Sequence, residues 1–516
     1  MKINPILAID SYKLAHISMY PEQIKETYLN LTPRVMKYFQ RLVPDEFKYD
    51  NKIVAFGVQM AVTDLVTQFA EEFFSKPLEQ VLEIYIDTIT PFIGDGIGVK
   101  DLIISEISKL HAVGYLPITI KALPEGSLIP VQTPVLTIRS TQFAWLGGYL
   151  ETYISQNTWK TITIATVSRL YRKILEHFSD LTCDNNDHLT WQGHDFADRG
   201  MSGTEDATRA GIAHATQFQG SDSVHAAYAA KHIYGFKTPL FAASVPATEH
   251  SIMQLGISQE SETETIHRLI KQYPSGILAV VCDTEDYWNT LTNILPTIKD
   301  EILARIPNSL GLAKFVVRPD SGDPVDVICG TNFTEVIVID SIPGHSGIYY
   351  NISEATTPEE KGSIEILWDI FGGTINSKGY KVLNPKVGLI YGDSITPQRA
   401  YEICKRLQAK GFASSNVVFG IGSYAYNYHT RDTLGMAIKC TAAWDIKGTL
   451  IETQKTVKTD STKKSAKGLL HVDSNFVMTD SVTPEQEATG ELKVLYHNGT
   501  LLLEDNFETI RTRAQQ

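Results

Sequence analysis

The stretch FVVRPDSGDP at residues 315–324 places one cation, two carboxylates and a tight turn directly after apolar, strand-forming residues. Pro319 restrains Arg318 to an extended conformation, and the Ser-Gly pair that follows favours a turn that presents Asp320. An arginine and a carboxylate held together at a strand end suit a ligand that carries both phosphate and hydroxyl groups. A salt-bridged turn without a ligand is the alternative interpretation.

Similar polar clusters follow five other short apolar runs. These runs are HDFADRGMSG (194–203), AASVPATEHS (242–251), ILAVVCDTEDYW (277–288), VGLIYGDSITP (387–397) and NVVFGIGSYAY (416–426). Helical patterns lie between them, two of which end near Gly235 and Gly411. Buried parallel strands read as continuous apolar runs, and the loops after their C-terminal ends carry the chemistry of α/β barrels. We therefore expect an α/β fold with an α/β barrel, incomplete or distorted.

The two ends of the chain have a different pattern. Helical periodicity covers 52–75, 76–90 and 101–112, and residues 118–140 alternate as antiparallel strands do. The C-terminal 80 residues are rich in strand patterns, with an Asn-Gly hairpin turn at 498–499. We predict a discontinuous α+β domain with an antiparallel sheet, formed by 1–160 and 436–516. Residues 161–435 form the barrel-like catalytic domain, with a surface insertion at about 330–375.

The bulk composition excludes several classes of function. A formal net charge of −13 argues against binding to nucleic acid or to an anionic membrane. The five cysteines are scattered without metal-ligand spacing and are odd in number, so a disulfide framework is not expected. No apolar run approaches the roughly 20 residues of a membrane span. These features predict a cytoplasmic protein in a reducing compartment.

Together the expected strand ends supply the groups that a phosphorylated sugar requires. Carboxylates accept hydrogen bonds from ribose hydroxyls or hold Mg²⁺, whereas arginines and glycine-rich backbone bind phosphate. The residues concerned are Arg199, Arg318, Arg431, Asp195, Asp222, Asp283, Asp320, Asp393, His250 and the glycines Gly420 and Gly422.

Each of these residues also has a structural interpretation. Asp222 or Ser221 is placed to cap the following helix, and capping is the interpretation that the local pattern favours. Asp393 is placed to cap the next helix along the chain. His250 and Phe196 would ordinarily be core residues, and glycines at a strand end often serve only the turn.

The motifs in their order resemble the nicotinamide phosphoribosyltransferases, a family of type II phosphoribosyltransferases. They are DSYKLAHISMYP (10–21), HDFADRG (194–200), FQGSDSV (218–224), SVPATEHS (244–251), VCDTEDYWN (281–289), RPDSGDP (318–324), YGDSI (391–395) and TRD (430–432). The resemblance covers nearly the whole chain. It implies formation of nicotinamide mononucleotide and pyrophosphate from nicotinamide and phosphoribosyl pyrophosphate with Mg²⁺. It also implies a homodimer whose active sites lie at the subunit interface.

The resemblance assigns roles to individual residues. Phe196 and Tyr12 of the second subunit would enclose the pyridine ring, and Asp222 would accept from the carboxamide. The other substrate-binding positions are Arg199, Ser244 and Arg318, then Gly392 and Asp393 for the ribose, Gly422, Ser423 and Arg431 for the 5′-phosphate, and Arg34 and Lys439 near the pyrophosphate or its entry path. Asp283 and Asp320 would serve the metal or the ribose. His250 would be phosphorylated by ATP as a co-substrate.

The implied chemistry agrees with the residue types. Displacing pyrophosphate from ribose requires neutralisation of the leaving group, a positioned ring nitrogen and nearby carboxylates. The ring nitrogen of nicotinamide is already a free nucleophile, so no activated Ser or Cys dyad is needed. His250, Arg318, Asp283 and Asp320 are the expected catalytic residues.

The sequence departs from the family pattern at two places. Ser423 replaces a glycine of the usual phosphate loop, and residues 330–375 are longer than expected.

Two other functions compete with the one above. A nicotinate phosphoribosyltransferase would share the architecture, although Asp222 should repel a carboxylate substrate. A non-catalytic nucleotide-binding relative would have no reason to keep His250.

Overall fold

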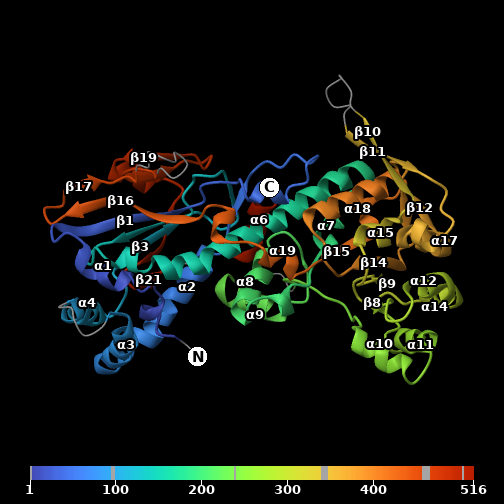
Figure 1. The fold of residues 1–516 in the computed structure, drawn as a ribbon, viewed down its shortest axis with the longest axis horizontal. Helices are drawn as coiled ribbons and strands as arrows, with labels where there is room; N and C mark the ends of the chain where they lie inside the picture. Colours follow the sequence, from blue (N-terminus) through green and yellow to red (C-terminus); the bar gives the residue numbers. More distant parts are fainter. Residues whose placement is uncertain (1–2, 94–98, 238–239, 339–346, 456–464, 503–504) are drawn as a thin grey trace.

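Two β-sheets and one long helix organise the chain (Figure 1). The computed structural model describes residues 3–93, 99–237, 240–338, 347–455, 465–502 and 505–516. The glycine-rich stretch GDGIG at 94–98, whose sequence resembles that of a phosphate-binding loop, lies outside the described residues. None of the helices in the described ranges has the length and apolar character that crossing a bilayer requires.

A six-stranded parallel sheet forms the barrel. Its order is β7 (Gly220–Ser221), β6 (Gly193–Asp195), β15 (Val417–Ile421), β14 (Val387–Tyr391), β9 (Ala313–Arg318) and β8 (Gly276–Val281). Every pairing in it is parallel. Five of its strands coincide with sequence runs that end in polar clusters. β8, β14 and β15 are almost entirely buried, as continuous apolar runs predict.

The segment 243–247 links the two edges of this sheet. Ala243 forms a parallel bridge with Gly220 of β7, and Ala247 forms one with Ala279 of β8. The segment was expected to be a strand of its own, but only these isolated bridges form. Each successive strand therefore lies beside the previous one around a ring, and the expectation of a distorted α/β barrel is confirmed.

The second sheet is antiparallel and draws its strands from both ends of the chain. Its order is β17 (Leu450–Glu452), β16 (Ala437–Asp445), β1 (Ile24–Thr32), β5 (Leu136–Ser140), β3 (Ile118–Ala122), β20 (Lys493–His497) and β21 (Thr500–Leu501). The predicted Asn-Gly hairpin joins β20 to β21, and both turn residues have positive φ angles.

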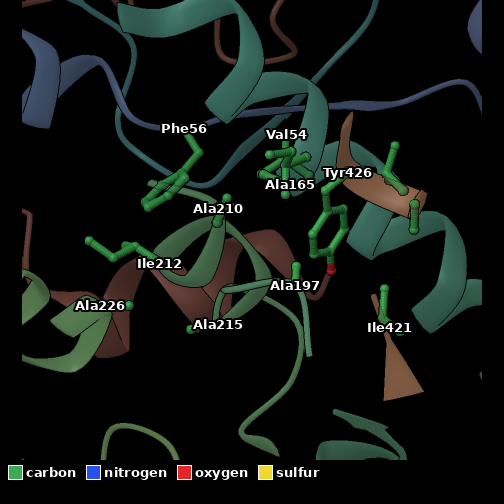
Figure 2. Close-up of a cluster of buried hydrophobic side chains, with 14 of the residues drawn as sticks. Val54, Phe56, Ala165, Ala197, Ala210, Ile212, Ala215, Ala226, Ile421 and Tyr426 are labelled. Carbon is green, nitrogen blue, oxygen red and sulfur yellow. The ribbon is translucent and has the colours of Figure 1, made fainter. Parts of the chain in front are cut away.

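Helix α6 (Glu151–Thr182) runs between the two sheets in Figure 1. It contacts α8 (Thr204–His214) and α18 (Pro397–Ala409) of the barrel as well as α2 (Val58–Phe69). Figure 2 shows Ala165 of α6 in the same apolar cluster as Ile212 of α8 and Ile421 of β15. The predicted boundary at 160/161 thus falls inside a continuous helix rather than in a linker.

Tyr426, also labelled in Figure 2, supplies the polar contacts of this cluster. Its hydroxyl lies 3.0 Å from Ser168 Oγ of α6 and 2.7 Å from His214 Nδ1 of α8. Burial lowers the pKa of His214 to about 3, so the ring is neutral. The short helix α19 (Ser423–Asn427) is thereby fixed between α6 and α8, directly after β15.

Further helices cover the barrel and the antiparallel sheet. They are α1 (Lys13–Met19), α3 (Leu78–Ile93), α4 (Val99–Val113), α9 (Val224–Ile233), α10 (His250–Ile257), α11 (Glu262–Gln272), α14 (Lys299–Leu303), α15 (Pro324–Cys329), α17 (Ser363–Phe371) and α21 (Phe507–Ala514). The insertion contains α17 and a hairpin of β10 (Phe333–Val338) and β11 (Gly347–Ile352) that projects beyond the barrel in Figure 1.

The structure corrects one expectation and adds one element at the chain ends. The helix predicted over 52–75 starts only at Val58, because Ile53–Ala55 forms strand β2 and pairs with β4 (Ser127–Ile129). The C-terminal region is rich in strands, as predicted, and it also contains helix α21. The Arg511 side chain donates to the carbonyls of Ala215 and Phe241, so α21 lies against the barrel.

Candidate functional site

The predicted site residues follow the C-terminal ends of neighbouring parallel strands. Phe196 follows β6, Asp222 follows β7, and Asp283 follows β8. Asp320 comes two residues after β9, and Gly392 comes directly after β14. In α/β barrels this end of the sheet carries the chemistry. The ring order of the strands therefore brings residues more than a hundred positions apart in the sequence to one place.

Phe196 lies against the ends of the next two strands of the sheet, β15 and β14. Its main-chain N–H donates to the carbonyl of Ile421, which fixes the backbone after β6 to β15. A Cβ atom at Gly420 would lie 2.5 Å from the Phe196 ring, and one at Gly392 would lie 3.5 Å from it. The Arg318 guanidinium stands over the same ring at 4.9 Å from its centre. Phe196 is half-buried and forms one wall of the site rather than part of the core.

Asp222 is held by two side chains instead of capping a helix. Its Oδ1 lies 2.9 Å from His194 Nε2 and accepts a hydrogen bond from Ser244 Oγ. The cap of α9 is Ser223, so the capping interpretation of Asp222 is wrong. Partial burial favours a higher pKa for Asp222, but the bonds from His194 and Ser244 and the charge of Arg318 outweigh it and hold the pKa below its ordinary value. Asp222 is therefore an ionised acceptor.

Sequence reasoning assigned no role to His194. The structure places its ring 4.8 Å from that of Phe196 as well as beside Asp222. The sequence signal that could have identified His194 was its spacing from Phe196, since residues two apart in a strand share one face. His194 thus connects the aromatic wall of the site to its carboxylate.

Asp283, Asp320 and His250 form a second group at the ends of β8 and β9. Asp283 Oδ2 accepts from the Asp320 N–H at 2.9 Å and from Ser321 Oγ at 2.6 Å. His250 Nε2 lies 4.0 Å from Asp283 Oδ1 and 3.9 Å from Asp320 Oδ2. His250 is half-buried at the start of α10 and faces carboxylates, so it is not a core histidine bonded to the backbone.

The turn after β9 is fixed from the neighbouring strand. The Tyr391 hydroxyl is within hydrogen-bond distance of the Ser321 carbonyl, at 3.0 Å, and of the Gly322 carbonyl, at 2.8 Å. Gly322 has a φ of 92°, a conformation that favours glycine. Asp323, the second carboxylate of the motif, accepts from the Val325 N–H and caps α15. Of the two carboxylates, only Asp320 faces the site.

Two carboxyl groups of the site have raised pKa values. Burial raises the pKa of Asp195 to about 6, although its Oδ1 accepts from the Ala197 N–H. Burial also raises the pKa of Asp320, and the charges of Asp283 and Asp393 raise it further against the effect of Arg318 and His250. Asp195 is fully buried below Phe196 and supports the loop, whereas Asp320 is accessible to a ligand.

Three of the predicted cations, Arg34, Arg431 and Lys439, gather near the end of β1 and the start of β16 in the antiparallel sheet. Arg34 follows β1 and donates from Nε to the Gly435 carbonyl, and Lys439 is on the neighbouring strand β16. Burial lowers the pKa of Lys439, and three neighbouring cations lower it further: Arg34, Lys455 and Arg431. Glu151 is the acidic group that opposes this shift. A cluster of several cations in one place suits a polyphosphate ligand.

Five predicted residues are more loosely placed. Arg199 is 90% exposed at its side chain and lies 3.8 Å from Glu249. Tyr12 is 60% exposed, and its described ring contacts are with His16 and Lys13 of its own helix. Asp393 is exposed and does not cap α18, which Thr396 does. Gly422 and Ser423 begin α19, with open space beside the Gly422 Cα.

The carboxylates Asp283 and Asp320 are chemically suited to a hard divalent cation. Asp283 Oδ1 is buried and has no hydrogen-bond partner among the described residues. In the same ranges no group of three or more His, Cys, Asp and Glu side chains forms a complete metal site. Mg²⁺ commonly takes one or two carboxylates and completes its shell with water and substrate phosphate. The donor set present therefore fits Mg²⁺ bound together with a phosphorylated substrate.

Comparison with known proteins agrees with this geometry. The model of the nicotinate phosphoribosyltransferase (NAPRTase) family matches residues 191–499, which include every strand of the barrel and most of the site. The chain belongs to this family. It is therefore a phosphoribosyltransferase, an enzyme that transfers a pentose phosphate.

Relatives match this family member over nine-tenths or more of its length. The nicotinamide phosphoribosyltransferase of Acinetobacter baylyi is 44% identical over 524 residues, covering 100% of this chain and 98% of its own. That of Mycoplasma pneumoniae is 34% identical over 489 residues, covering 90% of this chain and 95% of its own.

Two solved structures share the fold at low sequence identity. Human nicotinic acid phosphoribosyltransferase has a TM-score of 0.55 and 14% identity, covering 98% of this chain and 92% of its own. The nicotinate-nucleotide pyrophosphorylase of Pyrococcus furiosus has a TM-score of 0.53 and 13% identity, covering 99% of this chain and 95% of its own. These likenesses establish the architecture of an α/β barrel joined to an antiparallel sheet.

The packing of Phe196 predicts unequal effects of alanine at two nearby glycines. In Gly420→Ala the new methyl group meets the Phe196 ring and, at 2.7 Å, the Tyr391 carbonyl. We expect a loss of about 1–3 kcal/mol of stability, as overpacking usually causes. Gly422→Ala is the control, because no atom lies within 4 Å of its Cβ position and its φ is −87°. Thermal unfolding of both variants checks this, and equal melting temperatures would contradict the packing described.

Proposed function

We propose that this enzyme transfers the phosphoribosyl group of 5-phosphoribosyl 1-pyrophosphate to nicotinamide, in NAD salvage. The observation that carries the choice of substrate is the ionised Asp222 beside the Phe196 wall. Asp222 Oδ1 is bonded to His194 and Ser244, while Oδ2 has no donor among the described residues. A carboxamide N–H₂ can donate to that oxygen, whereas the carboxylate of nicotinate would be repelled.

The remaining groups suit the phosphorylated sugar. Asp320 and Gly392 lie together, with the Asp320 carboxylate 2.7 Å from a Cβ built on Gly392, so ribose hydroxyls can approach the backbone there. The half-buried start of α19 and the cations Arg431, Lys439 and Arg34 suit the two phosphate ends of the substrate. In the reaction the ring nitrogen attacks ribose C1, and the bond from C1 to the pyrophosphate oxygen breaks with its electron pair.

The residues of the chain make this displacement possible by position and charge. Phe196 and Asp222 would orient the pyridine ring, and Arg318 would contact substrate oxygens from its place over Phe196. Asp283 and Asp320 would hold Mg²⁺, which when bound neutralises charge on the phosphates of the substrate. The carboxylates near the ribose stabilise positive charge that develops at C1.

Two further features belong to the proposal. Tyr12 is exposed on its own subunit, so a homodimer in which Tyr12 of the second subunit covers the pyridine ring would complete the aromatic slot.

His250 would accept the γ-phosphoryl group of ATP, with release of ADP, and water would later hydrolyse the phosphohistidine. Its Nε2 faces Asp283 and Asp320, while Nδ1 lies 3.5 Å from Thr284 Oγ1.

A direct assay tests the transferase reaction. Purified protein is mixed with phosphoribosyl pyrophosphate, Mg²⁺ and either nicotinamide or nicotinate, and the mononucleotide products are separated. We expect nicotinamide mononucleotide with a kcat/KM well above that for nicotinate. Preferential formation of the nicotinate product would instead assign the chain the other activity of its family. Product from neither base would refute both transferase proposals.

Replacement of Asp222 tests how the base is selected. In Asp222→Asn the side chain keeps its shape but loses its charge, so kcat/KM for nicotinamide should fall by about 10- to 100-fold relative to nicotinate, the scale of one charge-assisted hydrogen bond. Asp326→Asn removes the same charge from the surface helix α15 and is the matched control. Unchanged preference between the two bases in Asp222→Asn would exclude the proposed contact.

The phosphohistidine is tested separately from the transfer. Incubation with γ-labelled ATP should place acid-labile, alkali-stable label on the wild type and on His232→Ala, whose histidine is exposed on α9. His250→Ala should carry none. If His250→Ala is labelled like the wild type, or if the wild type stays unlabelled, the ATP step is wrong while the transferase assignment stands.

A further inference from the structure

A pocket of about 520 Å³ lies at the end of the barrel opposite the site. Its wall includes side chains of α11, and its floor includes the segment 304–306. Ile306 donates its N–H to the Pro274 carbonyl at 3.0 Å and accepts from the Gly276 N–H at 3.1 Å, so the floor is tied to the beginning of β8. His250 and Asp283 lie beyond the other end of β8. At about 3.3 Å per residue the six-residue strand separates the two places by roughly 17 Å.

Arg305 is a cation below this pocket that has no ion pair among the residues the structure describes. The residue is only 2% exposed, and its Nη2 donates to the carbonyls of Gly276 at 3.0 Å and Ser275 at 3.5 Å. Its Nε and Nη1 are buried without a hydrogen-bond partner among the described residues, and no carboxylate there forms an ion pair with it. Burial lowers the pKa of Arg305 below its ordinary value. A buried guanidinium without an anion is costly, which points to a missing partner.

The rim of the pocket adds positive charge. Lys271 and Arg268 project from α11 and are both exposed. Arg268 is paired with Glu260 at 2.8 Å, whereas Lys271 has no ion pair within the described ranges. The acidic residue of the lining, Glu301, is already bonded to His267 at 2.8 Å. The charge that remains for a ligand is therefore positive, in a protein whose net charge is −13.

Apolar residues form the rest of the lining. Ile270, Pro274, Ala304 and Ile306 border the cavity between the cations, and Ile306 is 59% exposed. A volume of this size is typical of small-ligand sites, in which apolar walls surround a few polar anchors. Guanidinium and ammonium groups together favour phosphate oxygens. An apolar or planar group attached to the phosphate would cover the wall.

We propose that this pocket is a second ligand site, which binds a phosphate monoester carrying an apolar or planar group. The phosphate lies over Arg305 and Lys271, and the attached group packs on Ile270 and Ile306. The site is distinct from the active site because its residues surround the beginning of β8, whereas the active-site residues follow its end.

Phenyl phosphate is the probe that tests this site. It combines the phosphate and the planar apolar group that the proposed site requires. Inorganic phosphate carries only the first of these, and benzyl alcohol carries only the second. Titration of the full-length protein by calorimetry is paired with hydrogen exchange, which locates binding on residues 262–276 and 299–306. We expect protection of these two segments by phenyl phosphate at millimolar concentration, and weaker or no protection by the other two probes.

Substitutions separate this site from phosphate binding in the active site. Lys271→Gln should raise the Kd for protection of 262–276 about tenfold, the scale of one charge-assisted contact. Lys299→Gln is the matched control, since it removes the same charge from nearby α14 but does not line the pocket. Arg431→Gln should leave this Kd unchanged. Absence of protection in the wild type, or equal Kd values in Lys271→Gln and Lys299→Gln, would overturn the proposal.

Discussion

The packing of Phe196 on glycines of two neighbouring strands is the contact on which the arrangement of the site depends. Gly420 of β15 and Gly392 after β14 leave no side chain between the strand ends, so the ring lies directly on the backbone. The ring in turn supports the Arg318 guanidinium and stands beside His194, which holds Asp222. One aromatic side chain thus fixes the relative positions of a cation and a carboxylate from different strands.

Charge is separated within the site, although the protein as a whole is acidic. Carboxylates follow β7, β8, β9 and β14, where they suit hydroxyl groups, a metal ion and a neutral base. Cations gather on β16 and the residues that precede it, where the pKa of Lys439 is lowered by burial and by like charges around it. Such local concentration is what a polyanionic substrate requires of a protein with a net charge of −13.

Much of the barrel could be predicted, since its buried strands are continuous apolar runs that end in polar clusters. The prediction of a strand within 242–251 was wrong, because the segment closes the ring through single bridges instead of forming a full strand. The helix over 52–75 was predicted too long, since the apolar residues 53–55 satisfy a strand next to β4 as well as they would a helix. The final helix α21 and its contacts with the barrel were not foreseen, because nothing local to residues 507–514 indicates a partner near residue 215.

The sequence by itself determined which residue types follow each strand, the turn at 320–322 and the glycines Gly235 and Gly411 that end two helices, because these depend on neighbours within a few positions. The tertiary structure decided what the side chains contact. From the sequence Asp222 was expected to cap a helix, and only the pairing of β6 with β7 placed it beside His194. That Arg305 has no ion partner in the described part of the chain also became visible only in the fold. Hydrogen bonds and burial between distant segments depend on how the strands are ordered around the ring, which no local pattern records.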